Sequence, residues 1–241
     1  MDRNANAQAL ILHDSSQAPS VDIEFPTGFK EVELKETQRA LPLLTEATKV
    51  FQRFHQDSTR NHISRGKIQG IRPAVRIFRS DEYEEESYTM CSKLTVEEVK
   101  KLKNLFPNES LHNSIAVIVP DEESRKRLLD SGLEDQLDEI GFRVVTPMAA
   151  SERLSNDVPL GDGKDEITVG TIGDMNGMER CFVIIVGMDR AQTEDKALNQ
   201  INLSKIYCAC TRGMLHICLI NCMKFVSEEL QEIVPYVIGL L

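Results

Sequence analysis

The sequence of 241 residues lacks tryptophan, and only 5% of its residues are aromatic. It also lacks any apolar run close to the roughly 20 residues that a membrane-spanning helix needs. Near the N-terminus the short apolar stretch "ALIL" is followed by polar residues, so it is too short for the core of a signal peptide. We therefore expect an intracellular protein, cytoplasmic or nuclear, that has no membrane segment.

Basic residues are in the minority. The chain has 28 Lys and Arg against 38 Asp and Glu, which gives a net charge of −10. Because neutralisation of phosphates drives the affinity of proteins for nucleic acid, this balance argues against autonomous nucleic-acid binding. One basic segment, residues 60–72, remains open to two interpretations, a solvated loop or a local nucleic-acid patch.

Metal-binding and nucleophilic motifs are also missing. The six cysteines form no C-x-x-C pair and the five histidines are scattered, so we expect no metal site and interpret the cysteines as buried thiols. No G-x-S-x-G nucleophile elbow occurs, and no Ser/His/Asp or Cys/His arrangement stands out. The sequence therefore gives no support to a metalloenzyme or a hydrolase of the triad type.

A phosphate cradle is absent as well. The consensus G-x-x-x-x-G-K-[ST] does not occur, and in "GDGKDE", 161–166, Asp165 stands where the metal-binding hydroxyl would be. The segment "IAVIVPDEE", 115–123, imitates a strand with an Asp-Glu magnesium site. Its acids equally suit the first turn of the next helix, where they complement the helix dipole, and we favour that interpretation.

Helical patterns and punctuation divide the chain into three parts. We expect a flexible polar arm over 1–30, one domain over 31–225 and a helical tail over 226–241. Within the domain, helices are expected from about Pro42, over 94–106 with Thr95 and Glu98 as a capping box, and over 199–213 with Gly213 as its stop. Residues 147–166 are expected to form a loop.

Continuous apolar runs alternate with these helices. They predict strands at 74–78, 114–120, 142–147, 166–172, 181–187 and 214–222. Uninterrupted apolar strands are typical of a sheet that is covered on both faces. The predicted fold is therefore α/β, with a mostly parallel sheet between two layers of helices.

Two segments place polar side chains beside these strands. "TVGTIGDMNGMERCFVIIVGMD", 168–189, contains Thr171 and Glu179, and "IYCACTRGMLHICLI", 206–220, contains Arg212. All three lie at strand or helix ends, where ligands bind in α/β sheets. Simpler roles stay open: Arg212 as a partner of its own helix carbonyls, Glu179 as a solvated turn residue, and Thr171 as an ordinary strand end.

Both segments resemble motifs of superfamily 1 helicases of the UvrD type. "VGTIGDMNGMERCFVIIVG" is similar to T-x-H-x-x-K-G-L-E-F followed by a strand, and "LSKIYCACTRGMLHICLI" is similar to L-x-Y-V-A-x-T-R-A followed by a strand. "LKETQRALPLLTEATKVF", 34–51, resembles a third motif, L-x-x-N-Y-R-S-x-x-x-I. The motifs occur in the family's order and cover roughly 33–222. The resemblance implies the second, C-terminal RecA-like motor domain of such a helicase.

The family's roles can be carried over motif by motif. The resemblance assigns phosphate contacts to Arg39 and Arg212, which would act as arginine fingers, and the nucleotide side of the cleft to Glu179 and Gly177. It assigns contact with single-stranded DNA or RNA to Thr171 and to the position of Asn176. ATP and magnesium would be bound mainly by a separate P-loop domain, in cis or in trans. The chain alone would therefore not hydrolyse ATP.

Several residues depart from the family's pattern. Asn176 stands where the family has lysine, Gly173 stands where it has histidine, and "GMER" replaces "GLEF" and is closer to the helicase-like domains of Schlafen proteins. These departures weaken the nucleic-acid side. They motivate an alternative function, a degenerate helicase-fold interaction or regulatory module without ATPase or unwinding activity. A self-sufficient nucleotide-binding protein, based on "IAVIVPDEE", is a third interpretation.

Overall fold

The computed structural model describes residues 36–37, 41–52, 63–64, 71–78, 84–156, 163–188 and 204–222. The expected arm and tail, the whole of 1–30 and 226–241, lie outside these residues. Arg39 also lies outside them, so its expected role is a matter for experiment.

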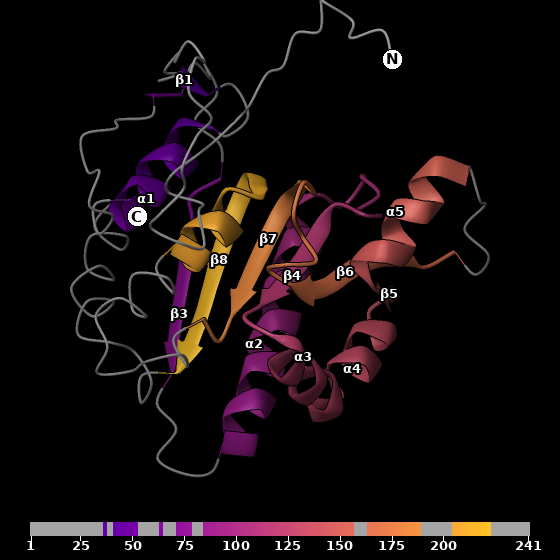
Figure 1. The fold of residues 1–241 in the computed structure, drawn as a ribbon. Helices are drawn as coiled ribbons and strands as arrows, with labels where there is room; N and C mark the ends of the chain where they lie inside the picture. Colours follow the sequence, from indigo (N-terminus) through magenta and orange to yellow (C-terminus); the bar gives the residue numbers. More distant parts are fainter. Residues whose placement is uncertain are drawn as a thin grey trace, which may run out of the picture.

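A six-stranded parallel sheet forms the centre of the domain (Figure 1). Its strand order is β3-β8-β7-β4-β6-β5, so β3 pairs with β8, which lies far from it in the sequence. The strands are β3 (Ala74–Phe78), β4 (Ile115–Val119), β5 (Phe142–Val145), β6 (Asp165–Thr171), β7 (Arg180–Val186) and β8 (Gly213–Cys222). Two short strands, β1 (Glu36–Thr37) and β2 (Ile63–Ser64), pair separately and in parallel.

Helices cover both faces of this sheet. They are α1 (Pro42–Gln52), α2 (Glu84–Leu105), α3 (Glu122–Leu128), α4 (Glu134–Glu139) and α5 (Pro147–Asn156), with a π-helical turn between α3 and α4 and a further helical segment at 204–210. Helix α1 and segment 204–210 bury apolar side chains in one core cluster, and α2, α3 and α4 bury theirs in a second cluster on the opposite face. This confirms the predicted three-layer α/β fold, and the main sheet is parallel throughout.

The burial of β4 explains why the strands could be predicted. All five of its residues are buried, with Ala116 and Ile118 in one core cluster and Ile115, Val117 and Val119 in the other. Successive side chains of a strand point to opposite faces, so a central strand between two helical layers must be apolar at every position.

Two local predictions are wrong. Thr95 and Glu98 do not begin a helix, because α2 runs unbroken from Glu84 and the Thr95 hydroxyl donates to the carbonyl oxygen of Cys91, one turn earlier. Residues 147–166 are not entirely loop, because α5 occupies the first ten of them. Thr146 precedes this helix and its hydroxyl accepts a hydrogen bond from Ala149 N–H, as a helix N-cap does.

Gly213 does not have its expected role either. It is the first residue of β8, and it is not among the glycines with positive φ, so it does not end the preceding helix in a left-handed conformation. An added Cβ at Gly213 would lie 2.7 Å from Ile217 Cγ2. Close packing at the start of β8 is therefore the reason for a glycine here.

The parallel strands give the sheet two distinct ends. We call the ends of β4, β7 and β8 at Ile115, Arg180 and Gly213 the amino edge, and the ends of β4, β6 and β7 at Val119, Thr171 and Val186 the carboxyl edge. In Figure 1 the strands β3, β8 and β7 run from the amino edge at the top to the carboxyl edge below. Within the described ranges, no helix combines the length and the apolar character required to cross a bilayer.

Candidate functional site

Glu179 and Arg212 meet at the amino edge. The backbone N–H of Arg180 donates to the carbonyl oxygen of Arg212 at 3.0 Å, and Arg180 pairs with Gly213 as β7 and β8 begin. Each strand is thus preceded by one of the two predicted residues, Glu179 before β7 and Arg212 before β8. Residues 179 and 212 are 33 positions apart in the sequence, and the fold brings their segments together at one site.

Arg212 is held by the end of the helical segment 204–210. Its N–H donates to the carbonyl oxygen of Ala209 at 3.1 Å, and the preceding Thr211 donates to that of Tyr207 at 2.9 Å. Only 8% of the surface of Arg212 is exposed, whereas Glu179 is half-buried. A guanidinium in such a partly desolvated setting interacts more strongly with an anion than one in bulk water.

Arg180 is a third charged residue at this edge, and the sequence motifs did not assign it a role. Its side chain is 6% exposed, and its Nη1 donates to the carbonyl oxygen of Glu179 at 2.9 Å. Its Nη2 lies 3.4 Å from the hydroxyl of Thr168 on β6. Burial lowers the pKa of this guanidinium. The signal in the sequence was the "R" of "GMER", where the helicase motif has an apolar residue.

The turn 172–179 connects the two edges. Met175, near its middle, is fully buried in the core cluster of the α1 face, and Met178 packs against the same cluster. Asn176 and Gly177 are exposed between them. Gly177 has φ of +77°, a left-handed conformation that favours glycine, and an added Cβ would meet no atom within 4 Å. The turn geometry alone thus accounts for Gly177.

Thr171 lies at the opposite edge from Glu179 and Arg212. It pairs with Val119 at the carboxyl end of β4, whereas Arg180 precedes Phe182, the partner of Ile115 at the amino end. At about 3.3 Å per residue along a strand, the six-residue offset separates the two groups by roughly 20 Å. The structure therefore joins two of the predicted site residues and separates the third from them.

The side chain of Thr171 is engaged by Asp174. The Thr171 hydroxyl donates to Asp174 Oδ2 at 2.7 Å, the Thr171 N–H donates to the same oxygen at 3.0 Å, and Asp174 N–H returns a bond to the hydroxyl at 3.2 Å. The Thr171 hydroxyl therefore already donates its proton within the protein. The carboxylate of Asp174 lies directly beside this hydroxyl.

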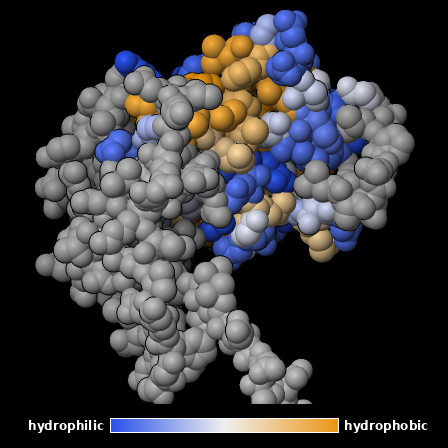
Figure 2. Space-filling view, turned by 90° about the horizontal axis from the view of Figure 1, so that it is seen from above, coloured by the Kyte–Doolittle hydropathy of each residue, from blue (hydrophilic) through white to orange (hydrophobic). Residues whose placement is uncertain are grey.

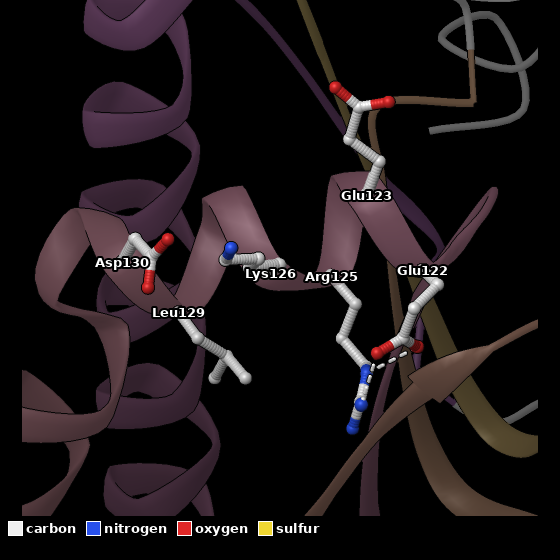
Figure 3. A pocket seen from close by; sticks show the side chains of 6 residues that line it. All are labelled: Glu122, Glu123, Arg125, Lys126, Leu129 and Asp130. Atoms are coloured by element: carbon white, nitrogen blue, oxygen red, sulfur yellow. Dashed lines mark hydrogen bonds and ion pairs between the residues drawn. The ribbon is translucent and has the colours of Figure 1, made fainter.

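The acidic segment after β4 caps a helix, as the sequence interpretation favoured. Asp121 is the N-cap of α3 and its carboxylate accepts from Ser124 N–H at 2.8 Å, with Glu122 and Glu123 in the first turn. A pocket on the outer side of α3 is lined by Glu122, Glu123, Arg125, Lys126, Leu129 and Asp130 (Figure 3). Arg125 and Glu122 pair with each other there, and none of the predicted site residues lines this pocket.

A buried cluster of charges joins α2 to β3 and β8. Glu98 is fully buried, and its carboxylate accepts from Arg76 Nη2 and Lys101 Nζ, each at 3.0 Å, and lies 3.1 Å from His216 Nε2. Burial raises the pKa of Glu98, but hydrogen bonds from His216, Lys101 and Arg76 outweigh it and lower that pKa to about 2. The same contacts show why Glu98 is not a helix-capping residue.

The surface beside the amino edge is partly apolar. Figure 2, which looks down on this end of the molecule, shows an apolar area next to a hydrophilic one. Helix α2 ends on this side, because the ring of Phe106 packs at a tilt against that of Phe182 near the start of β7, with 5.3 Å between ring centroids. Leu105, the last residue of α2, is 52% exposed. Apolar surface of this kind is often covered by another protein or domain.

The described residues include no group of three His, Cys, Asp or Glu side chains that could hold a metal ion. The six cysteines are all free thiols, and four of them, Cys91, Cys210, Cys218 and Cys222, are buried. Burial raises the pKa of the Cys218 thiol to about 12. The four buried thiols are part of the packed interior.

Comparisons with known proteins support the fold. No protein-family model matches the chain, and no curated protein matches it. Among solved structures, it is similar to the C-terminal domain of a possible DNA helicase from Lactobacillus plantarum WCFS1, with 16% identity and a TM-score of 0.50, over 83% of this chain and 96% of that one. At this identity the likeness establishes a helicase-like α/β fold and not the function of individual residues.

Proposed function

We propose that this chain is the second motor domain of a helicase-like NTPase of superfamily 1, and that its amino edge completes the nucleotide site of a separate P-loop domain. The observation that carries the proposal is the 3.0 Å hydrogen bond from Arg180 N–H to the carbonyl oxygen of Arg212. It puts Glu179 and Arg212 side by side, in agreement with the motif resemblance. The fold of the helicase-domain neighbour supports the same proposal.

Arg212 would act on the γ-phosphate of ATP. A guanidinium has fixed charge and a planar set of donors that can bind two phosphate oxygens at once. It can therefore stabilise charge on a phosphoryl group in the transition state, where an arginine finger contributes about 10³–10⁵ in rate. Arg39 would be the second finger, on the motif that precedes α1. Glu179 and Gly177 would contact the rest of the nucleotide.

The partner is a P-loop domain in the same polypeptide or in another one. This chain has no G-x-x-x-x-G-K-[ST] segment, so ATP and Mg²⁺ would be held mainly by that domain. The carboxylates after β4 do not replace a magnesium site, because Asp121 already caps α3. The apolar area at the end of the molecule seen in Figure 2 is a surface that such a domain would cover.

A second candidate function is a helicase-fold interaction or regulatory module without ATPase or unwinding activity. One specific observation favours it over a nucleic-acid motor: the Thr171 hydroxyl is donated to Asp174, whose negative charge would repel a phosphate. Asn176, exposed in the same turn, supplies no positive charge to compensate. Only the first candidate requires Arg212 to accelerate ATP hydrolysis, so a measurement of ATP hydrolysis distinguishes the two.

The test joins the chain to a P-loop motor domain and measures ATP hydrolysis. Arg212→Ala is expected to lower the turnover rate by about 10³ or more. Arg127→Ala is the control, because Arg127 lies on α3 and pairs with Glu123. ATPase activity that survives Arg212→Ala, Glu179→Ala and Arg39→Ala unchanged would exclude the motor function and favour the interaction module.

A further inference from the structure

Arg180 makes contacts to both residues of the proposed nucleotide edge. Its backbone N–H bonds the carbonyl oxygen of Arg212 at 3.0 Å, and its side chain bends back so that Nη1 bonds the carbonyl oxygen of Glu179 at 2.9 Å. One residue thus ties together the two chain segments that precede β7 and β8. The β7–β8 register is irregular between Arg180 and Phe182, so the ordinary ladder does not position this corner by itself.

Burial of the Arg180 guanidinium at this position costs solvation free energy. Arg180 is 6% exposed, burial lowers its pKa, and within the described residues both side-chain hydrogen bonds go to neutral oxygens, those of Glu179 and Thr168. Its Nε has no hydrogen-bond partner among the same residues. An apolar side chain of similar size would avoid the loss of solvation, so stability alone does not explain an arginine here.

The acceptor at Glu179 identifies what the side chain does. A carbonyl that accepts from a rigid guanidinium cannot rotate freely, so the bond restrains the peptide after Glu179, the backbone from which the Glu179 side chain projects. The other terminal nitrogen of the guanidinium, Nη2, lies 3.4 Å from the hydroxyl of Thr168 on β6, and this contact ties the side chain to the sheet. The segment of Glu179 is therefore held to β6 through the Arg180 side chain, as well as to the start of β8 through the Arg180 backbone N–H.

We propose that Arg180 is a positioning residue, whose side chain holds the segment of Glu179 in the placement beside Arg212 that binds a nucleotide. This inference rests on the proposed function, because it assigns Arg180 a role only if Glu179 and Arg212 bind nucleotide. Arg180 itself does not contact the nucleotide. Loss of a comparable supporting contact around a binding site typically costs about 10–100-fold in affinity or activity.

The test is an NMR titration with ATP of this chain joined to a P-loop motor domain, because that domain would hold most of the nucleotide. In the unaltered protein, ATP at millimolar concentrations is expected to shift the backbone amides of Glu179 and Gly213 and not those of β4. Arg180→Leu is expected to weaken this binding about tenfold or more, with thermal stability unchanged or raised. Arg180→Lys keeps one donor and is expected to recover part of the affinity. In combination with Glu179→Ala, Arg180→Leu should add little.

The outcomes separate the two proposals. If ATP shifts no amide at the amino edge of the joined protein, or if Arg212→Ala leaves its rate of ATP hydrolysis unchanged, the proposed function fails. If Arg212→Ala slows ATP hydrolysis but a folded Arg180→Leu binds ATP as well as the unaltered protein, only the positioning role fails. Should Arg180→Leu not fold, Arg180→Lys and Arg180→Gln take its place, and if none of the three folds, Arg180 is a folding residue and the inference is overturned.

Discussion

The hydroxyl of Thr171 donates its proton to the carboxylate of Asp174 at 2.7 Å, and both backbone N–H groups of the pair close the same turn. The sequence resemblance assigns Thr171 to the nucleic-acid backbone. In the folded domain, this threonine stabilises the turn after β6 and has a negative charge directly beside it. The charge of Asp174 also extends to Arg125 on α3, whose pKa is raised by its hydrogen bond to Glu122 first and by Asp174 to a smaller extent.

Thr171→Val is therefore expected to affect stability and not oligonucleotide binding. The substitution removes the hydroxyl that donates to Asp174 and accepts from its N–H, which should lower the free energy of unfolding by about 1–2 kcal/mol. Urea unfolding measures this change, and fluorescence anisotropy with a single-stranded oligonucleotide measures binding. A large loss of oligonucleotide affinity at unchanged stability would restore Thr171 as a phosphate contact.

Glu98 makes the stability of the domain sensitive to acid. Its pKa in the folded protein is about 2, below the ordinary value of 4.5, so its contribution is present above pH 4.5 and is lost as the pH falls toward 2. The shift corresponds to about 3 kcal/mol at most. Glu98→Gln should lower stability at pH 7 by a comparable amount, and the difference from the unaltered protein should shrink in acid.

Glu97→Gln is the matched control for this prediction, because Glu97 is the neighbour of Glu98 on α2 and its side chain is 45% exposed, 3.7 Å from Arg76. An exposed pair contributes about 0–1 kcal/mol. Equal effects of the two substitutions in urea titrations between pH 3 and pH 7 would mean that the buried cluster is not the source of the acid sensitivity.

Gly170 is expected to tolerate no side chain. An added Cβ would lie 2.4 Å from Pro147 Cγ and 3.0 Å from its Cδ, so α5 would have to move away from β6. Gly170→Ala should therefore lower the free energy of unfolding by about 1–3 kcal/mol. Gly173→Ala, three residues later, has only the Thr171 hydroxyl near its Cβ, at 3.7 Å, and should be nearly neutral in the same thermal melts.

The strands of the sheet could be predicted because their signal is local. A central strand such as β4 is apolar at every position, and a pattern of this kind can be read without knowledge of its neighbours. The helix start at Thr95 was predicted from an equally local pattern, but here tertiary contacts decided the outcome. Arg76 and His216, which are 22 and 118 positions from Glu98 in the sequence, contact its carboxylate and hold it on the side of α2 that faces the sheet.

The arrangement of the candidate site could be predicted only in part. The motif order indicated that Glu179 and Arg212 belong together, and they do meet at the amino edge. The separation of Thr171 from them depends on the register of β6, β4 and β7, which no single segment contains. Arg180 was missed because its role depends on where its side chain bends, and a residue type in a motif does not specify that.

The most direct test of the central claim is a single-turnover measurement of ATP hydrolysis at saturating ATP, with this chain joined to a P-loop motor domain and with Arg212 replaced by lysine. Lysine keeps the charge but not the planar pair of donors. If Arg212 acts on the transition state, the rate should fall by about 100-fold or more while ATP binding changes little. An unchanged single-turnover rate would contradict the assignment of Arg212 as an arginine finger.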